Sequence, residues 1–282
     1  MTTKTNDPRQ RTEPYLDDAD MWKAGFGGPA GQENERFIEA LELWQPVALP
    51  PVHGPKSVQI IEENERVMEL RLAFQNTGGW RTRHGKVAAI GRQFAGDLNI
   101  YGTNGWDLAG FAECHCDGYG DVGSFSERVN PEGRSWFTYW LAIHAGPSLA
   151  GVDIQTTSYA CGKIVRLDME LNGRKRTYMY VYAPSKSVQR RPFLKSFQNA
   201  MPTGRDVIIM GDFNTRLSKK DHSGDRPLNT GSAEWEHIRE VNQTQDVWRT
   251  RHPQAREYTW HSNPTARTRI DWLEASAWSA DE

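Results

Sequence analysis

Apolar and polar residues alternate in several short segments of the chain, which is the pattern of half-buried β-strands. The clearest of these segments are Glu69–Gln75, Leu108–Glu113, Lys163–Leu171 and Arg176–Tyr182. A continuous apolar run, Val207–Met210, is too short for a helix or a membrane span and indicates a buried strand. We also expect strands in the β-prone segments Ser135–Ile143, Asp246–Arg249, Tyr258–Trp260 and Thr268–Trp272.

Helical spacing occurs between some of these strands. Val87, Ile90 and Phe94 recur at intervals of three and four residues, which predicts a helix between the first two strands. The segments 192–200 and 233–243 are further candidate helices. A strand, a helix and a strand, each strand ending in a polar residue, form the βαβ pattern, whose ligands lie beyond the carboxyl ends of the strands. The pattern therefore predicts an α/β fold.

The first part of the chain has a different composition. Residues 1–57 are rich in charge, glycine and proline, which predicts a flexible N-terminal extension with room for one short amphipathic helix between Glu35 and Trp44. The folded domain is expected over residues 58–282. Further along, Asn172-Gly173 separates two alternating segments and is a strong signal for a β-hairpin.

Composition limits the kinds of protein this chain can be. Its 282 residues, of which 37% are hydrophobic, suit one large domain with a sizeable core. Three cysteines are too few for a disulfide framework, which favours an intracellular protein of the nucleus or cytoplasm over a secreted one. The sequence has neither a membrane-spanning stretch nor a signal-peptide core, so we expect a soluble protein with no membrane partner. Nothing in it indicates an obligate protein partner, and a monomer is expected.

Charge is unevenly distributed along the chain. The net charge is −2, but the segment from Cys161 to Ile270 holds 20 Lys and Arg against 11 Asp and Glu, a balance of +9. Such a segment can form a phosphate-facing surface or an ordinary solvated one. The cluster Cys114-His115-Cys116 has the residue types of a zinc site, but no second cluster supplies further ligands, and buried thiols are the simpler interpretation.

The stretch Gly211-Asp-Phe-Asn214 follows the buried run directly. If the strand continued past Gly211, Asp212 and Asn214 would point the same way and place a carboxylate beside an amide at the edge of the core. The alternative is a strand followed by an ordinary Asx turn, since Asp and Asn are common turn residues. The stretch alone leaves both interpretations open.

Other predicted strands also end in acids, amides or a hydroxyl. Together the strand ends offer Asn76, Glu113, Tyr182, Asp212, Asn214 and Asp271. Carboxylates such as Glu113 and Asp212 are hard ligands suited to Mg²⁺, which binds proteins through one or two carboxylates plus substrate phosphate. A carboxylate can also deprotonate a water molecule, and an amide or a tyrosine hydroxyl can hydrogen-bond a phosphoryl oxygen. This set predicts a metal and phosphate site.

These residues stand in the order found in a known group of enzymes. Asn76, the strand ending in Glu113, Tyr182-Ala-Pro-Ser, Gly211-Asp-Phe-Asn-Thr and Arg269-Ile-Asp-Trp resemble the endonuclease/exonuclease/phosphatase superfamily, which includes apurinic/apyrimidinic endonucleases and DNase I. More narrowly, Asp246-Val-Trp-Arg, His252-Pro, Tyr258-Thr-Trp and Thr268-Arg-Ile-Asp are similar to the endonuclease domain of non-LTR (LINE-type) retrotransposons. The resemblance covers about Leu70 to Trp272.

The resemblance implies a four-layer α/β sandwich, two packed β-sheets flanked by helices, that cuts a DNA phosphodiester with Mg²⁺, or with Mn²⁺ in its place. By the same resemblance, Glu113 is the principal metal ligand and Asn76 supports the metal and the phosphate. Tyr182 contacts the scissile phosphate, and Asp212 positions or deprotonates the attacking water. Asn214 stabilises the pentacovalent phosphate, and Asp271 orients a catalytic histidine. A plainer alternative for Asp271 is an ion pair with Arg269.

One departure from the family pattern bears on activity. Members of the family carry a late Ser-Asp-His element, whose histidine contacts the scissile phosphate, and this sequence contains no such triplet. We therefore expect the domain to be incomplete at its C-terminus and to lack its last strand or strands. Two alternatives to an active endonuclease stay open. The chain could be a catalytically impaired module that binds nucleic acid at most, or a superfamily phosphatase that acts on a small phosphoester.

Overall fold

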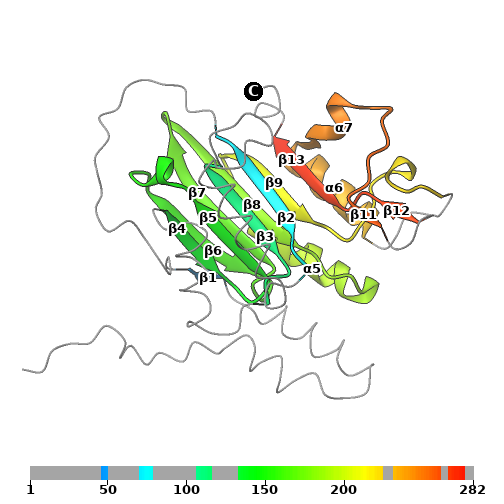
Figure 1. Ribbon diagram of the computed structural model, residues 1–282, viewed down its shortest axis with the longest axis horizontal. Coiled ribbons are helices and arrows are strands. Elements are labelled where there is room, and N and C mark those ends of the chain that lie inside the picture. The colour runs from blue at the N-terminus through cyan, green and yellow to red at the C-terminus, as the bar shows by residue number, and fades with distance from the viewer. Residues whose placement is uncertain are drawn as a thin grey trace, which may run out of the picture.

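The structure is a computed structural model, and it describes residues 46–49, 70–78, 106–115, 133–224, 231–261 and 266–276. The helices expected around residues 35–44 and 87–94 lie outside these ranges. Two β-sheets pack face to face, and helices cover the far side of the larger sheet (Figure 1). The α/β class and the pair of sheets predicted from the sequence are confirmed.

The larger sheet has seven strands, in the spatial order β1-β6-β7-β8-β9-β13-β10. In that order they are Val47–Ala48, Ile154–Tyr159, Ile164–Leu171, Arg174–Tyr182, Asp206–Asp212, Asp271–Ser276 and Thr244–Asp246. β8 and β9 pair in parallel, and the other neighbours in the sheet are antiparallel. The carboxyl ends of β8 and β9 therefore lie side by side at the same end of the sheet. The antiparallel strand β13 begins at that end.

The smaller sheet has four strands, in the order β2-β3-β5-β4. They are Leu72–Asn76, Leu108–Ala112, Leu141–Ala145 and Arg134–Phe137. β2 and β3 pair in parallel, as the predicted strand–helix–strand unit requires. A separate short hairpin joins β11 (Trp260–His261) to β12 (Arg267–Thr268).

Three α-helices are described: α5 (Ser187–Ala200), α6 (Ser232–Asn242) and α7 (Val247–Arg251). Two 3₁₀ turns, η2 (Pro147–Leu149) and η3 (Lys219–Asp221), complete the elements. Within the described part of the chain, no helix combines the length and apolar character needed to cross a membrane.

Alternation along the central strands builds two layers of core. On β8, Met179 and Val181 pack toward α5 and α6, whereas Tyr178 and Tyr180 face the smaller sheet. Gly110 of β3 lies directly under the ring of Tyr180, where a Cβ atom would come within 2.0 Å of a ring carbon. The two sheets therefore approach closely because this position has no side chain.

The predicted hairpin is confirmed. Asn172 and Gly173 connect β7 to β8 as a two-residue loop, and both have positive φ, 51° and 72°. These backbone angles are those of the tight turns that suit the twist of paired strands.

Three expectations differ from the structure. The segment Asp246–Arg249, expected to be a strand, begins helix α7 instead, because the Asp246 carboxylate accepts the backbone N–H of Arg249 and caps the helix. The β-prone segment 135–143 is divided into β4 and β5, because the Thr138 hydroxyl accepts hydrogen bonds from the backbone N–H groups of Trp140 and Leu141 and forms a turn. In addition, Val47–Ala48 pairs with β6 although it falls within the predicted extension. Leu49 is buried directly after this strand.

Candidate active site

The residues singled out from the sequence lie together at one end of the two sheets, where several strands finish. Asn76, Tyr182 and Asp212 end strands β2, β8 and β9, and Glu113 directly follows β3. Asp271 begins β13, opposite Asp212. Parallel pairing of β2 with β3, and of β8 with β9, brings these strand ends together.

Asn76 joins the two sheets at this end. Its Nδ2 donates hydrogen bonds to Glu113 Oε1 at 3.0 Å and to Asp212 Oδ2 at 2.9 Å. Its Oδ1 accepts a hydrogen bond from the backbone N–H of Gly78. Because its Nδ2 donates to both carboxylates, the Asn76 side chain holds Glu113 and Asp212 close together across the two sheets.

Tyr182 contacts the same carboxylate from the other sheet. Its hydroxyl donates to Glu113 Oε1 at 3.0 Å. Burial raises the pKa of Tyr182, and the charge and hydrogen bond of Glu113 raise it further, so the phenol keeps its proton. Tyr182 therefore acts as a hydrogen-bond donor at this site.

Asp212 and Asn214 show that the turn interpretation describes the backbone correctly. The strand ends at Asp212, and Asn214 has a left-handed backbone with φ of 48°, so of the two interpretations the continued strand is wrong. The reason is an Asx turn, in which Asp212 Oδ1 accepts the backbone N–H of Asn214 at 2.9 Å. Asn214 Nδ2 donates to the carbonyl of Ala183 at 2.8 Å, and this bond keeps the amide beside the strand end that carries Tyr182.

Gly211 is required by the packing of the same strand end. A Cβ atom at this position would lie 2.2 Å from the carbonyl oxygen of Val181 on β8. The glycine of the Gly-Asp-Phe-Asn stretch therefore lets β9 pair closely with β8 just before the acid.

Asp212 and Asp271 are direct cross-strand partners on β9 and β13. Like charges in this arrangement repel. Burial raises the pKa of Asp212 to about 7, and the charges of Asp271 and Glu113 contribute in the same direction. The pKa of Asp271 is raised as well, mainly by burial. An acid that titrates near neutral pH is suited to accept a proton from water.

Glu113 has an unusual backbone conformation. Its φ is 56°, in the left-handed region that residues with a side chain seldom adopt. Bonds on both sides hold it there: the Cys114 N–H donates to the carbonyl of Trp140, and both the N–H and the hydroxyl of Thr77 donate to the carbonyl of Ala112. Strain of this kind is found mostly at functional sites.

The donor set suits a small divalent cation. Glu113, Asp212 and Asp271 are electrostatically coupled carboxylates, and Asp271 Oδ1 is buried and accepts no hydrogen bond from the described residues. In the same part of the chain, no group of three or more His, Cys, Asp or Glu side chains forms a complete metal-binding cluster. Mg²⁺ usually keeps several waters and takes only one or two carboxylates from the protein.

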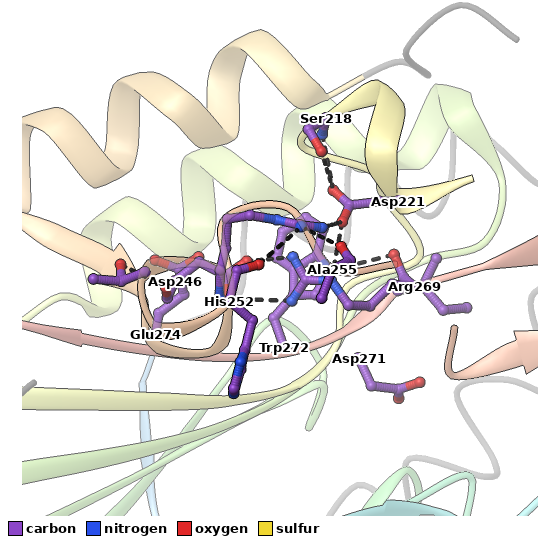
Figure 2. A network of polar contacts seen from close by, with 12 residues as sticks. Ser218, Asp221, Asp246, His252, Ala255, Arg269, Asp271, Trp272 and Glu274 are labelled. Atoms are coloured by element: carbon purple, nitrogen blue, oxygen red, sulfur yellow. Dashed lines mark hydrogen bonds and ion pairs between the residues drawn. The ribbon is translucent and has the colours of Figure 1, made fainter. Parts of the chain in front are cut away.

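A buried ion-pair network anchors the start of β13 (Figure 2). Arg269 pairs with Asp246 through both terminal nitrogens and with Asp221 Oδ1 through Nε at 3.0 Å. Asp271 does not pair with Arg269, so the plainer alternative for this acid is wrong. In Figure 2 the carboxylate of Asp271 points away from the network, although it belongs to the same strand.

The network also gives the Asp246-Val-Trp-Arg motif a physical basis. Asp246 accepts the backbone N–H of Arg249 and so caps helix α7. Arg249 in turn reaches Asp221 Oδ1 at 2.7 Å. Sequence reasoning identified the motif but not Asp221, which lies in a separate polar loop and is completely buried.

The two described residues of the cysteine cluster, Cys114 and His115, make ordinary packing and hydrogen-bond contacts. Cys114 is buried, and its thiol donates to the carbonyl of Phe111. The His115 ring packs edge-on against Tyr139 and Trp140. Cys116 lies outside the described residues.

Comparison with solved structures identifies the fold. The chain is similar to an AP endonuclease from Archaeoglobus fulgidus, with a TM-score of 0.58 and 15% identity over 76% of this chain and 89% of that one. It is also similar to the catalytic domain of Xenopus laevis APE2, with a TM-score of 0.55 and 16% identity over 74% and 83%. A 3′-5′ exonuclease from Neisseria meningitidis gives a TM-score of 0.53 and 14% identity over 74% and 87%. The chain thus shares the fold of these AP endonuclease and exonuclease structures, as the sequence resemblance predicted.

One curated protein is similar to this chain in sequence. The chain is 26% identical over 130 residues to a Xenopus laevis protein described as the transposon TX1 uncharacterized 149 kDa protein. The match covers 44% of this chain and 10% of the relative's length. No family model matches the chain.

Proposed function

We propose that this chain is a DNA endonuclease domain of the retrotransposon type, which hydrolyses a phosphodiester bond with Mg²⁺, or with Mn²⁺ in its place. The observation that carries the proposal is the convergence of Asn76, Glu113, Tyr182 and Asp212 through hydrogen bonds of 2.9 to 3.0 Å between residues distant in sequence. The fold and the similarity to a transposon protein support the same conclusion.

Each residue has a role that its surroundings permit. Glu113 would bind the metal, and a bound Mg²⁺ would neutralise charge on the phosphate during displacement. Asp212, whose pKa lies near 7, would take a proton from the attacking water. Tyr182 would turn its hydroxyl to a phosphoryl oxygen, and Asn214 would use its second amide hydrogen in the same way. Asp271, opposite Asp212 on β13, would orient a catalytic histidine, as the family resemblance implies.

The partner in this proposal is DNA. One solved structure of similar fold, a Neisseria 3′ phosphatase with a TM-score of 0.53, is described as bound to a product DNA hairpin. The +9 balance of the segment from Cys161 to Ile270 is consistent with a phosphate-facing surface.

The test is a nicking assay on supercoiled plasmid with Mg²⁺. We expect the parent protein to produce nicked circles, and both chelation with EDTA and the Asp212→Ala substitution to abolish them. Glu170→Ala is the matched control, since Glu170 is an exposed acid on β7 of the same sheet, and it should cut like the parent.

A folded parent that cuts nothing with either Mg²⁺ or Mn²⁺ refutes the proposal. A gel-shift measurement on the same plasmid then decides whether the chain binds DNA without cutting it. Circular dichroism of all three proteins shows that they are folded.

A further inference from the structure

A buried lysine lies behind the candidate site. Lys163 directly precedes β7 and is only 3% exposed. Its Nζ lies 3.2 Å from the centroid of the Trp140 ring and 4.7 Å from that of Tyr182. Lysine is almost never fully buried without a specific partner, so this placement calls for a reason.

The two rings form an aromatic pocket for the ammonium group. Their centroids are 5.3 Å apart and their planes differ by 31°. An ammonium group over an aromatic face is stabilised by the ring's negative potential, and more so when it is desolvated. Burial lowers the pKa of Lys163 to about 7, while the charge of Glu113 acts in the opposite direction.

Lys163 holds the functional tyrosine at two points. Its backbone carbonyl accepts the N–H of Tyr182 at 2.9 Å, and its ammonium contacts the ring of the same residue. The Trp140 carbonyl accepts the N–H of Cys114, the residue after Glu113. Lys163 and its aromatic pocket thus contact both segments that meet in the Tyr182–Glu113 hydrogen bond.

We propose that Lys163 is a positioning and charge-balancing residue of the site: it fixes the Tyr182 ring against Trp140, and its positive charge attracts the carboxylate of Glu113. This inference rests on the proposed function, because it assigns Lys163 a part in a site that binds metal at Glu113. Lys163 is too deeply buried to contact DNA and is not a catalytic residue.

The proposal predicts two effects of opposite sign when the charge is removed. The ammonium and a metal ion both interact with Glu113, and like charges repel, so Lys163→Met should tighten metal binding roughly three- to tenfold. Without its support, Tyr182 is held less firmly, and turnover should fall about tenfold or more while the KM for DNA stays the same.

The first measurement is Mn²⁺ binding without DNA at pH 6, below the pKa of Lys163, so that the parent carries the ammonium charge. Binding is followed by the electron paramagnetic resonance signal of free Mn²⁺. Lys163→Met should bind Mn²⁺ more tightly than the parent. Lys163→Arg, which keeps the charge, should bind it like the parent. Lys175→Met removes an exposed charge from β8, the strand that carries Tyr182, and should also bind Mn²⁺ like the parent. The second measurement is nicking of plasmid by the same proteins, with kcat and KM determined separately.

The outcomes distinguish this inference from the proposed function. If the parent does not nick DNA, the proposed function fails, and the Mn²⁺ comparison still tests Lys163. Unchanged or weaker Mn²⁺ binding by a folded Lys163→Met protein overturns the inference, and so does a parent that binds no Mn²⁺. Undiminished turnover in this variant also overturns it.

Lys163→Gln is the second uncharged variant in case methionine prevents folding. If neither uncharged variant folds while Lys163→Arg does, the charge serves folding alone and the inference is wrong.

Discussion

Replacing Asp212 by asparagine should stabilise the protein at alkaline pH. The carboxylate is 3% exposed and lies opposite Asp271, so its ionised form is costly in the folded state. Asparagine keeps an oxygen that can accept the N–H of Asn214, but it carries no charge. The substitution therefore removes the electrostatic cost and preserves the turn.

The size of the effect follows from the raised pKa. Each tenfold change in an acid equilibrium is worth about 1.4 kcal/mol, so a rise from 3.8 to about 7 corresponds to about 4 kcal/mol once Asp212 is ionised. The folded state keeps this proton up to about pH 7, whereas the unfolded chain loses it near pH 4. Folding takes up a proton between these values, and the parent therefore loses stability as the pH rises through this window.

Between pH 5 and pH 8 the stability of Asp212→Asn relative to the parent should increase by about 2 to 3 kcal/mol. The variant also loses the hydrogen bond from Asn76, which lowers its unfolding free energy by about 1 kcal/mol at every pH and leaves the change with pH unaffected. Urea unfolding in EDTA, followed by circular dichroism at both pH values, measures the difference. Other titrating groups are common to both proteins and cancel to first order. A difference in unfolding free energy that is the same at pH 5 and pH 8 would refute the reasoning.

Three further substitutions test other parts of the structure. Arg269→Ala leaves two buried aspartates without their shared partner and should lower the free energy of urea unfolding by about 3 to 5 kcal/mol. An undiminished unfolding free energy would show that the network does not anchor β13. Gly110→Ala should cost about 2 kcal/mol or more because the fully buried Tyr180 ring cannot move aside, and Gly151→Ala, which meets no atom within 4 Å, serves as its control in thermal unfolding. Tyr182→Phe should lower the nicking rate about 100-fold with little change in melting temperature, and equal rates would exclude a role for the hydroxyl.

Local chemistry explains which features could be predicted from the sequence. The turn at Asn172-Gly173 depends on two residues that tolerate positive φ, and the buried strand before Asp212 depends on a short apolar run. Both signals lie within a few neighbouring positions. The candidate site followed from acids and amides at strand ends, because parallel pairing brings such ends together.

Contacts between distant segments were not predictable in this way. Lys163 looks like the polar start of an alternating strand, and only the packing of Trp140 and Tyr182 shows that it is enclosed. Asp221 stands in a polar loop, and its burial depends on arginines 28 and 48 positions away. A residue whose role depends on partners so far along the chain leaves no local pattern.

The left-handed backbone of Glu113 sets folding against function at one position. Glycine adopts that conformation without penalty, whereas a residue with a side chain costs about 1 to 2 kcal/mol there. Glycine would also remove one of three mutually repelling carboxylates. Glu113→Gly should therefore raise the free energy of unfolding, although the position carries the carboxylate that the proposed site would use to bind a metal ion.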